Sequence, residues 1–126
     1  MTNYSSLPGL EGLYLEDSYV LAILETDSEL KFDLDAVLTQ KSPDYHAPLP
    51  GEQYCYQRGV LVFSAVQSRK WDSRSTQTFH DATGDEDLGN IDTFVFDGGV
   101  YKLEGDWGEV ELYSDKAPTF IPQASI

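Results

Sequence analysis

Residues 91–113, IDTFVFDGGVYKLEGDWGEVELY, decide the fold of this chain of 126 residues. The stretch contains three apolar runs that are separated by two glycine-containing connections, a pattern typical of strands joined by tight turns. In chain order these are Ile91–Phe96, the turn Asp97-Gly98-Gly99, Val100–Glu104, the connection Gly105-Asp106-Trp107-Gly108, and Glu109–Tyr113. The stretch therefore predicts a three-stranded antiparallel meander.

The rest of the chain repeats short apolar runs between Gly, Pro, Asp and Ser, which favours strands over helices. The apolar run Tyr19–Leu24 predicts a covered central strand. Alternation from Leu30 to Leu34 predicts a strand with one solvent-facing side, and the break in phase at Ala36-Val37-Leu38 indicates either a β-bulge or one helical turn. Further strands are predicted at Gly12–Glu16, Ser18–Glu25, Thr76–His80 and, split at Arg58-Gly59, in Gln53–Val66. Loops are predicted at Lys41–Glu52, Ser68–Ser75 and Asp81–Asn90.

About seven or eight short strands predict an all-β fold, either an antiparallel sandwich or an open barrel. The chain is 40% hydrophobic, which is too apolar for a disordered acidic chain. We expect a single β domain over residues 12–116, preceded by a flexible segment over residues 1–11. Residues 117–126 carry two prolines and form either a free tail or a short edge strand.

The net charge of the chain limits the classes of molecule that it can bind. Asp and Glu total 22 and Lys and Arg total 8, for a net charge of −14. This excess argues against sequence-independent binding to nucleic acid or anionic lipid, which requires clustered basic residues. It favours a basic protein partner, a cation, or no specific partner. The sequence therefore predicts an acidic protein-binding module, for example an inhibitor or immunity-type protein for a basic partner.

Compartment signals are few. The single Cys55 excludes an internal disulfide, and Met1–Gly12 lacks the basic and apolar regions of a signal peptide. The longest apolar run, Tyr19–Leu24, is too short to cross a bilayer. We therefore expect a soluble cytoplasmic protein with no membrane partner.

The acidic segment after His80 is the sharpest local motif. Oxygen-bearing side chains recur at alternating positions, as in loops that bind Ca²⁺, at Asp81, Thr83, Asp85, Asp87 and Asp92. The segment departs from an EF-hand, since Glu86 stands where glycine is required and the flanking helices are missing. A solvated acidic turn and a Ca²⁺ site are the two interpretations.

Two further features are candidates for binding. Arg69, Lys70 and Arg74 surround Trp71, so that an acidic segment can dock there by charge and cation–π contact, unless the group folds against the acidic surface of the chain itself. Trp107 either packs on the sheet or projects as an interface anchor. Packing on the sheet is the default prediction.

No catalytic signature is present. His46, His80 and Cys55 lack ligand spacing or a nucleophile motif, and neither a phosphate-binding loop nor a nucleophile elbow occurs. An enzyme is therefore the less favoured interpretation. A third hypothesis is a small-molecule pocket in the sandwich or barrel mouth, lined by tyrosines such as Tyr19, Tyr54, Tyr56 or Tyr101.

Four segments resemble small bacterial proteins of uncharacterised function. They are Leu15-Glu16-Asp17-Ser18-Tyr19-Val20-Leu21, Ser42-Pro43-Asp44-Tyr45-His46-Ala47-Pro48, Gly89-Asn90-Ile91-Asp92 and Gly105-Asp106-Trp107-Gly108-Glu109-Val110-Glu111. The resemblance runs through most of the chain and implies a bacterial protein of one domain. It implies no activity and no catalytic residues.

Overall fold

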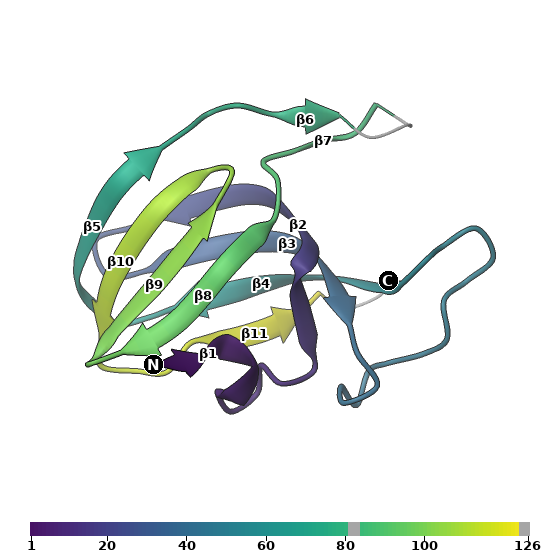
Figure 1. Ribbon diagram of the computed structural model, residues 1–126, viewed down its shortest axis with the longest axis horizontal. Helices are drawn as coiled ribbons and strands as arrows, with labels where there is room; N and C mark the ends of the chain where they lie inside the picture. The colour runs from purple at the N-terminus through teal and green to yellow at the C-terminus, as the bar shows by residue number, and fades with distance from the viewer. Residues whose placement is uncertain (81–83, 124–126) are drawn as a thin grey trace.

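Two antiparallel sheets lie face to face without closing into a barrel in the computed structural model, which describes residues 1–80 and 84–123 (Figure 1). Within those residues, sheet A has the strand order β1-β8-β9-β10-β5 and sheet B the order β11-β4-β3-β2, while β6 and β7 pair only with each other. The strands are β1 (Thr2–Asn3), β2 (Leu13–Glu25), β3 (Leu30–Leu38), β4 (Cys55–Phe63), β5 (Val66–Arg74), β6 (Phe79–His80), β7 (Glu86–Asp87), β8 (Ile91–Asp97), β9 (Val100–Gly105), β10 (Gly108–Ser114) and β11 (Thr119–Pro122). The predicted all-β fold is confirmed, and of the two predicted alternatives the structure is the antiparallel sandwich.

The meander of residues 91–113 forms the centre of sheet A, as the sequence predicts. Asp97 pairs with Val100 across a two-residue turn, and both turn residues have positive φ, +58° at Gly98 and +87° at Gly99. Glycine adopts such angles without steric cost, which explains why this turn carries two glycines.

Trp107 lies in the core between the sheets. Its side chain has no exposed surface, its ring centroid is 5.0 Å from that of Phe32, and its Nε1 donates a hydrogen bond to the Asn90 carbonyl at 3.0 Å. The polar atom of the indole is thus satisfied while the ring is buried. Packing on the sheet, the default prediction for Trp107, is confirmed, and the side chain is not available as an interface anchor.

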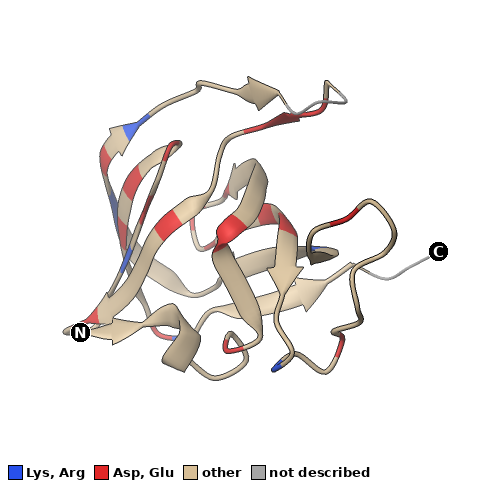
Figure 2. Cartoon of the chain, turned by 45° about the vertical axis from the view of Figure 1, so that its right-hand side comes forward, with Lys and Arg blue, Asp and Glu red and all other residues tan. Residues whose placement is uncertain are grey.

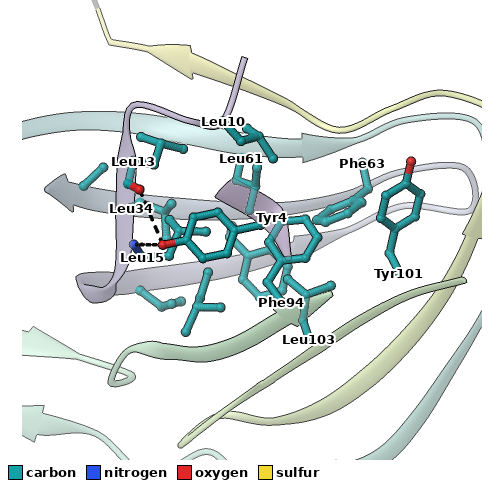
Figure 3. Packing of buried hydrophobic residues seen from close by; sticks show 14 of the residues in the cluster. Tyr4, Leu10, Leu13, Leu15, Leu34, Leu61, Phe63, Phe94, Tyr101 and Leu103 are labelled. Atoms are coloured by element: carbon teal, nitrogen blue, oxygen red, sulfur yellow. Dashed lines mark hydrogen bonds between the residues drawn. The ribbon is translucent and has the colours of Figure 1, made fainter. Parts of the chain in front are cut away.

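The N-terminal segment is part of the same core. Tyr4, in the 3-10 turn η1 (Tyr4–Ser6), stacks on Phe94 with ring centroids 5.7 Å apart, and Leu10 is fully buried (Figure 3). The Tyr4 hydroxyl accepts the Leu15 N–H at 3.0 Å and donates to the Glu16 carboxylate. Burial, followed by the hydrogen bond to Glu16, raises the pKa of Tyr4.

The irregularity that the sequence indicates near Ala36 lies on the neighbouring strand. β3 pairs with β4 at every position from Leu30 to Leu38, whereas β2 shifts its register against β3 between Tyr14 and Tyr19. The Ser18 hydroxyl bridges the shift, because it accepts the Val37 N–H at 2.8 Å and donates to the Tyr14 carbonyl at 2.7 Å. The two strands predicted on either side of Asp17 are therefore one strand with an irregular register.

The predicted break at Arg58-Gly59 is wrong, because β4 runs through it. A Cβ at Gly59 would stand 2.4 Å from the Phe120 ring and 2.7 Å from the Ile121 carbonyl oxygen. Glycine at this position permits β11 to approach β4, and it makes no turn. The C-terminal segment thus forms the short edge strand that was one of the two predicted alternatives.

The predicted loop Ser68–Ser75 is also wrong, because all of its residues except Ser75 belong to β5. This strand pairs with β10 and is the edge of sheet A. Val66 is buried, and the later residues of the strand are half-buried or exposed. An edge strand with little buried surface lacks apolar alternation, and its charged side chains discourage pairing with other chains.

The segment around β6 and β7 extends away from the sandwich (Figure 1). The strand predicted over Thr76–His80 is reduced to the two residues of β6, and the predicted acidic loop contains β7. Val20 holds the end of this segment on β2, donating to the Gly89 carbonyl and accepting the Leu88 N–H, both at 2.8 Å. Among the residues described, no helix has the length and apolar character needed to cross a membrane.

Candidate functional site

The outer face of sheet B carries two rows of side chains that cross three strands. Strand pairing places Val37 of β3 between Tyr14 of β2 and Tyr56 of β4. The next row on the same face is Tyr19, Asp35 and Arg58. On β3 the intervening Ala36 is fully buried, so Asp35 and Val37, and the residues paired with them, lie on the outer face of the sheet.

An open pocket of about 760 Å³ lies over this face. Its floor is formed by Tyr19, Asp35, Tyr56 and Arg58 of the three strands. Further lining comes from the loop before β4, at Gly51 and Glu52, and from β7 and its preceding residue, at Asp85, Glu86 and Asp87. We call this cavity the acidic pocket.

The charges of the acidic pocket are unbalanced. Burial raises the pKa of Asp35, Arg58 acts to lower it, and Glu52 adds to the rise. The guanidinium of Arg58 is itself engaged, since its Nη2 lies 3.3 Å from Asp33 Oδ2. Red acidic positions are widespread on the strands, on β7 and in the long loop, whereas blue basic positions are few (Figure 2). The pocket is thus a negatively charged concavity on an acidic molecule.

Tyr54 joins the two ends of this face. Its ring packs edge to face against two other tyrosines, with its centroid 6.3 Å from that of Tyr14 and 6.2 Å from that of Tyr56. Its hydroxyl donates a hydrogen bond to Asp17 Oδ2 at 2.6 Å. The hydrogen bond to Asp17, aided by burial, raises the pKa of Tyr54 to about 12. The phenol therefore stays protonated and donating throughout the neutral range.

A second, smaller pocket of about 230 Å³ adjoins Tyr54. It is lined by Tyr14, Tyr45, Pro48 and Tyr54, among others, and Val37 forms part of its base. We call it the tyrosine pocket. In the described part of the chain, five of the eight tyrosines line one of the two pockets. Aromatic side chains with a polar tip, gathered in this way, are typical of binding surfaces.

The predicted tyrosine-lined pocket is distributed differently from the expectation. Tyr19 and Tyr56 line the acidic pocket and Tyr54 lines the tyrosine pocket. Tyr101 is buried between the sheets, where its ring centroid lies 4.6 Å from that of Phe96. It takes no part in either pocket.

The predicted Ca²⁺ ligands are not gathered in the part that is described. Asp81 and Thr83 lie outside the described residues. Asp87 Oδ1 accepts the Gly89 N–H at 2.7 Å, and burial followed by the charges of Asp106, Glu104 and Glu16 raises the pKa of Asp92. Among residues 1–80 and 84–123, no three His, Cys, Asp or Glu side chains are grouped to hold a metal ion. The Ca²⁺ hypothesis remains a prediction, tested by whether Ca²⁺ raises the melting temperature and whether Asp85→Asn with Asp87→Asn abolishes that rise.

The predicted basic site on β5 is neutralised within the chain. Glu25 forms ion pairs with Arg69, at 3.0 Å, and with Arg74, and it accepts the Trp71 Nε1–H at 3.2 Å. The Arg74 guanidinium stacks 4.2 Å above the Trp71 ring, and Lys70 pairs with Asp72 at 3.3 Å. Burial acts to raise the pKa of Glu25, but the hydrogen bonds from Arg74, Trp71 and Arg69 lower it overall.

The histidines and the thiol lie apart from the pocket floor. His46 Nδ1 is 2.8 Å from the Ala47 carbonyl oxygen, and His80 Nε2 is 3.0 Å from Glu86 Oε1. Cys55 is buried and borders the tyrosine pocket.

Asp35, Glu52 and Arg58 are pocket residues that sequence reasoning missed. A signal was present in the alternation of β3, which sends Asp33 and Asp35 to the solvent-facing side. The alternation does not say which segments cover that side, and so the charged lining of the pocket was not predicted.

No protein-family model, no curated protein and no solved structure matches this chain. The assignment of function therefore rests on the geometry and charge of the outer face of sheet B.

Proposed function

We propose that this protein is an acidic binding module that receives a basic segment of a partner protein in the acidic pocket. One observation carries the proposal. Among the described residues, a single basic side chain, Arg58, faces five carboxylates in the pocket lining, namely Asp35, Glu52, Asp85, Glu86 and Asp87. Because Arg58 already pairs with Asp33, the pocket retains an excess of negative charge.

The form of the pocket agrees with a cationic side chain as its occupant. Its volume of about 760 Å³ is far larger than one ion needs, and it is open to solvent. Tyr19 and Tyr56 place aromatic rings beside the carboxylates. Rings and carboxylates together favour Lys or Arg, by cation–π contact and by charge-assisted hydrogen bonds.

The charge of the whole chain supports the same class of partner. A net charge of −14 attracts basic molecules over a distance that depends on salt, and thereby speeds their encounter with the pocket. We therefore expect binding that weakens as ionic strength rises.

A paired set of charge variants tests the proposal. Asp35→Asn with Glu52→Gln removes two pocket carboxylates, and Glu109→Gln with Glu111→Gln removes two from the outer face of sheet A on β10. Affinity for a fluorescein-labelled, arginine-containing peptide is measured by fluorescence polarisation at several salt concentrations. We expect the pocket variant to weaken binding about tenfold and the β10 variant to change it little. An equal loss in both variants would contradict the proposal, since it would show attraction by net charge alone.

A free diamine serves as competitor in the same assay. The proposal expects the diamine to compete weakly, because the partner segment makes contacts outside the pocket. If the diamine binds as tightly as the peptide, the ligand of the pocket is a small organic cation and the proposal of a protein partner is contradicted.

A further inference from the structure

We infer that the partner segment is an extended stretch of chain that spans both pockets, with a proline over Tyr14 and Tyr54 and a Lys or Arg side chain in the acidic pocket. This inference rests on the proposed function and specifies the partner. It draws on Tyr14 and Tyr54 of the tyrosine pocket, which the charge argument leaves unused.

The spacing of the rings fits an extended chain. The ring centroid of Tyr54 is 6.3 Å from that of Tyr14 and 6.2 Å from that of Tyr56. Side chains on one face of an extended strand recur about every 6.6 Å. Tyr14 and Tyr56 lie two strands apart in sheet B, a distance of about 10 Å that three residues of an extended or polyproline chain cover.

The chain already places a proline at the apolar end of this face. Pro48, from the loop before β4, lines the tyrosine pocket together with Tyr14, Tyr45 and Tyr54. This end of the face is therefore lined by three aromatic rings and an apolar pyrrolidine ring. Grooves lined by aromatic side chains bind proline-rich segments because such segments are already extended and lose little entropy on binding.

The exposure of two tyrosines supports the same conclusion. Tyr14 and Tyr19 are 38% and 39% exposed and lie on either side of the register shift in β2, where they pair with Val37 and Asp35 of β3. Each ring borders one of the pockets. Tyr and Arg dominate the energetics of protein interfaces, and a rigid tyrosine loses little conformational freedom when it is covered.

The two ends of the face differ in chemistry, which decides which residue type of the segment lies at each end. Val37 and Pro48 make the tyrosine pocket apolar, while Asp35 and Glu52 make the other pocket negative. A proline about three residues away from a basic residue matches this arrangement. A basic residue seated at the tyrosine pocket would place charge over the apolar end and leave the carboxylates without a partner.

The test compares two fluorescein-labelled nonapeptides. In the first, two adjacent prolines precede an arginine, with the nearer proline three positions from it. In the second, both prolines are replaced by glycine, so that the net charge is the same. We expect the proline peptide to bind the native protein about fivefold more tightly. Equal affinities for the two peptides would overturn the inference.

Single tyrosine variants locate the contact. Tyr14→Ala should remove the advantage of the proline peptide and leave the glycine peptide unchanged. Tyr113→Ala is the matched control, because this tyrosine is 51% exposed on β10, on the other sheet. Thermal melts verify that both variants fold, which is expected since neither ring is buried. A proline advantage that persists in Tyr14→Ala would also overturn the inference.

The same measurements distinguish a failure of the proposed function from a failure of the inference about the extended segment. If Asp35→Asn with Glu52→Gln leaves the affinity for both peptides unchanged, the acidic pocket is not the site and the proposed function is overturned. If that variant weakens both peptides equally while Tyr14→Ala changes neither, the pocket binds a basic side chain and only the extended segment is refuted.

Discussion

The hydroxyl of Tyr54 donates a hydrogen bond of 2.6 Å to the carboxylate of Asp17, which lies 37 positions earlier in the chain. This contact ties the end of the long loop before β4 to strand β2 at the edge of sheet B. The same loop carries Glu52 to the wall of the acidic pocket. One phenol thus helps to hold the wall of the proposed site in place.

We predict that Tyr54→Phe loosens this loop. The ring contacts remain, but the hydrogen bond to Asp17 is lost, so the segment from residue 41 to residue 53 opens more often. Trypsin should then cut after the exposed Lys41 faster than in the native protein, as followed by mass spectrometry. Tyr113→Phe, on an exposed tyrosine of β10, is the control and should leave the rate unchanged. Equal cleavage of all three proteins would show that the hydroxyl does not restrain the loop.

Ser18 gives the second prediction. Its buried hydroxyl satisfies the Val37 N–H and the Tyr14 carbonyl where β2 shifts its register. Ser18→Ala leaves a buried N–H without its acceptor, at a cost of about 1–3 kcal/mol in the free energy of unfolding. Chemical denaturation measures the loss, and Ser68→Ala, at an exposed position on β5, should cost much less. A cost for Ser18→Ala as small as that of the control would contradict the bridging role.

Glu25 gives a prediction that depends on pH. Its pKa is lowered in the folded chain, so its contribution to stability is complete above the ordinary glutamate pKa of about 4.3 and is lost as pH falls through the lowered value. Glu25→Gln should lower the free energy of unfolding by about 1 kcal/mol at pH 7, allowing for partial solvent exposure.

The pH profile distinguishes this from a packing effect. The stabilities of the native protein and of Glu25→Gln should converge in acid, because the native carboxylate is then protonated. Denaturant melts from pH 7 downward measure the difference. A difference in stability that stays constant with pH would show that the stabilising contacts of Glu25 with Arg69, Arg74 and Trp71 do not depend on its negative charge.

Gly59 gives the fourth prediction. A methyl group there meets the Phe120 ring and the Ile121 carbonyl, so Gly59→Ala should destabilise the fold by roughly 1–3 kcal/mol. Removing the ring by Phe120→Ala should relieve part of that clash. The double variant, measured by chemical denaturation, should therefore lose less stability than the two single variants predict together. Strictly additive losses would show that β11 is displaced without contacting residue 59.

The meander of sheet A and the burial of Trp107 could be predicted from the sequence because their signals are local. The glycines at the turn and the alternation of apolar and acidic residues lie within a few positions of the strands they form. The excess of acidic residues is likewise visible in composition and limits the class of partner.

The strands that were mispredicted depend on neighbours far away in the chain. β5 is polar because it is an edge strand paired on one side with β10, and no residue within it announces that partner. Gly59 resembles a turn residue in the sequence, but it lies in mid-strand to admit β11. Local patterns report the backbone preference of a residue, and they do not report which segment approaches it.

The sequence by itself determined that this chain is acidic, rich in β-strand and able to bury a core, and which residues of β3 face solvent. Only the tertiary structure decided that Tyr19, Asp35 and Arg58 share one row, that Glu52 and β7 form walls above it, and that Arg69 and Arg74 are neutralised by Glu25. The physical reason is that alternation along a strand selects a face, whereas a site on that face is formed by strand pairing and by loops that come from distant positions in the chain.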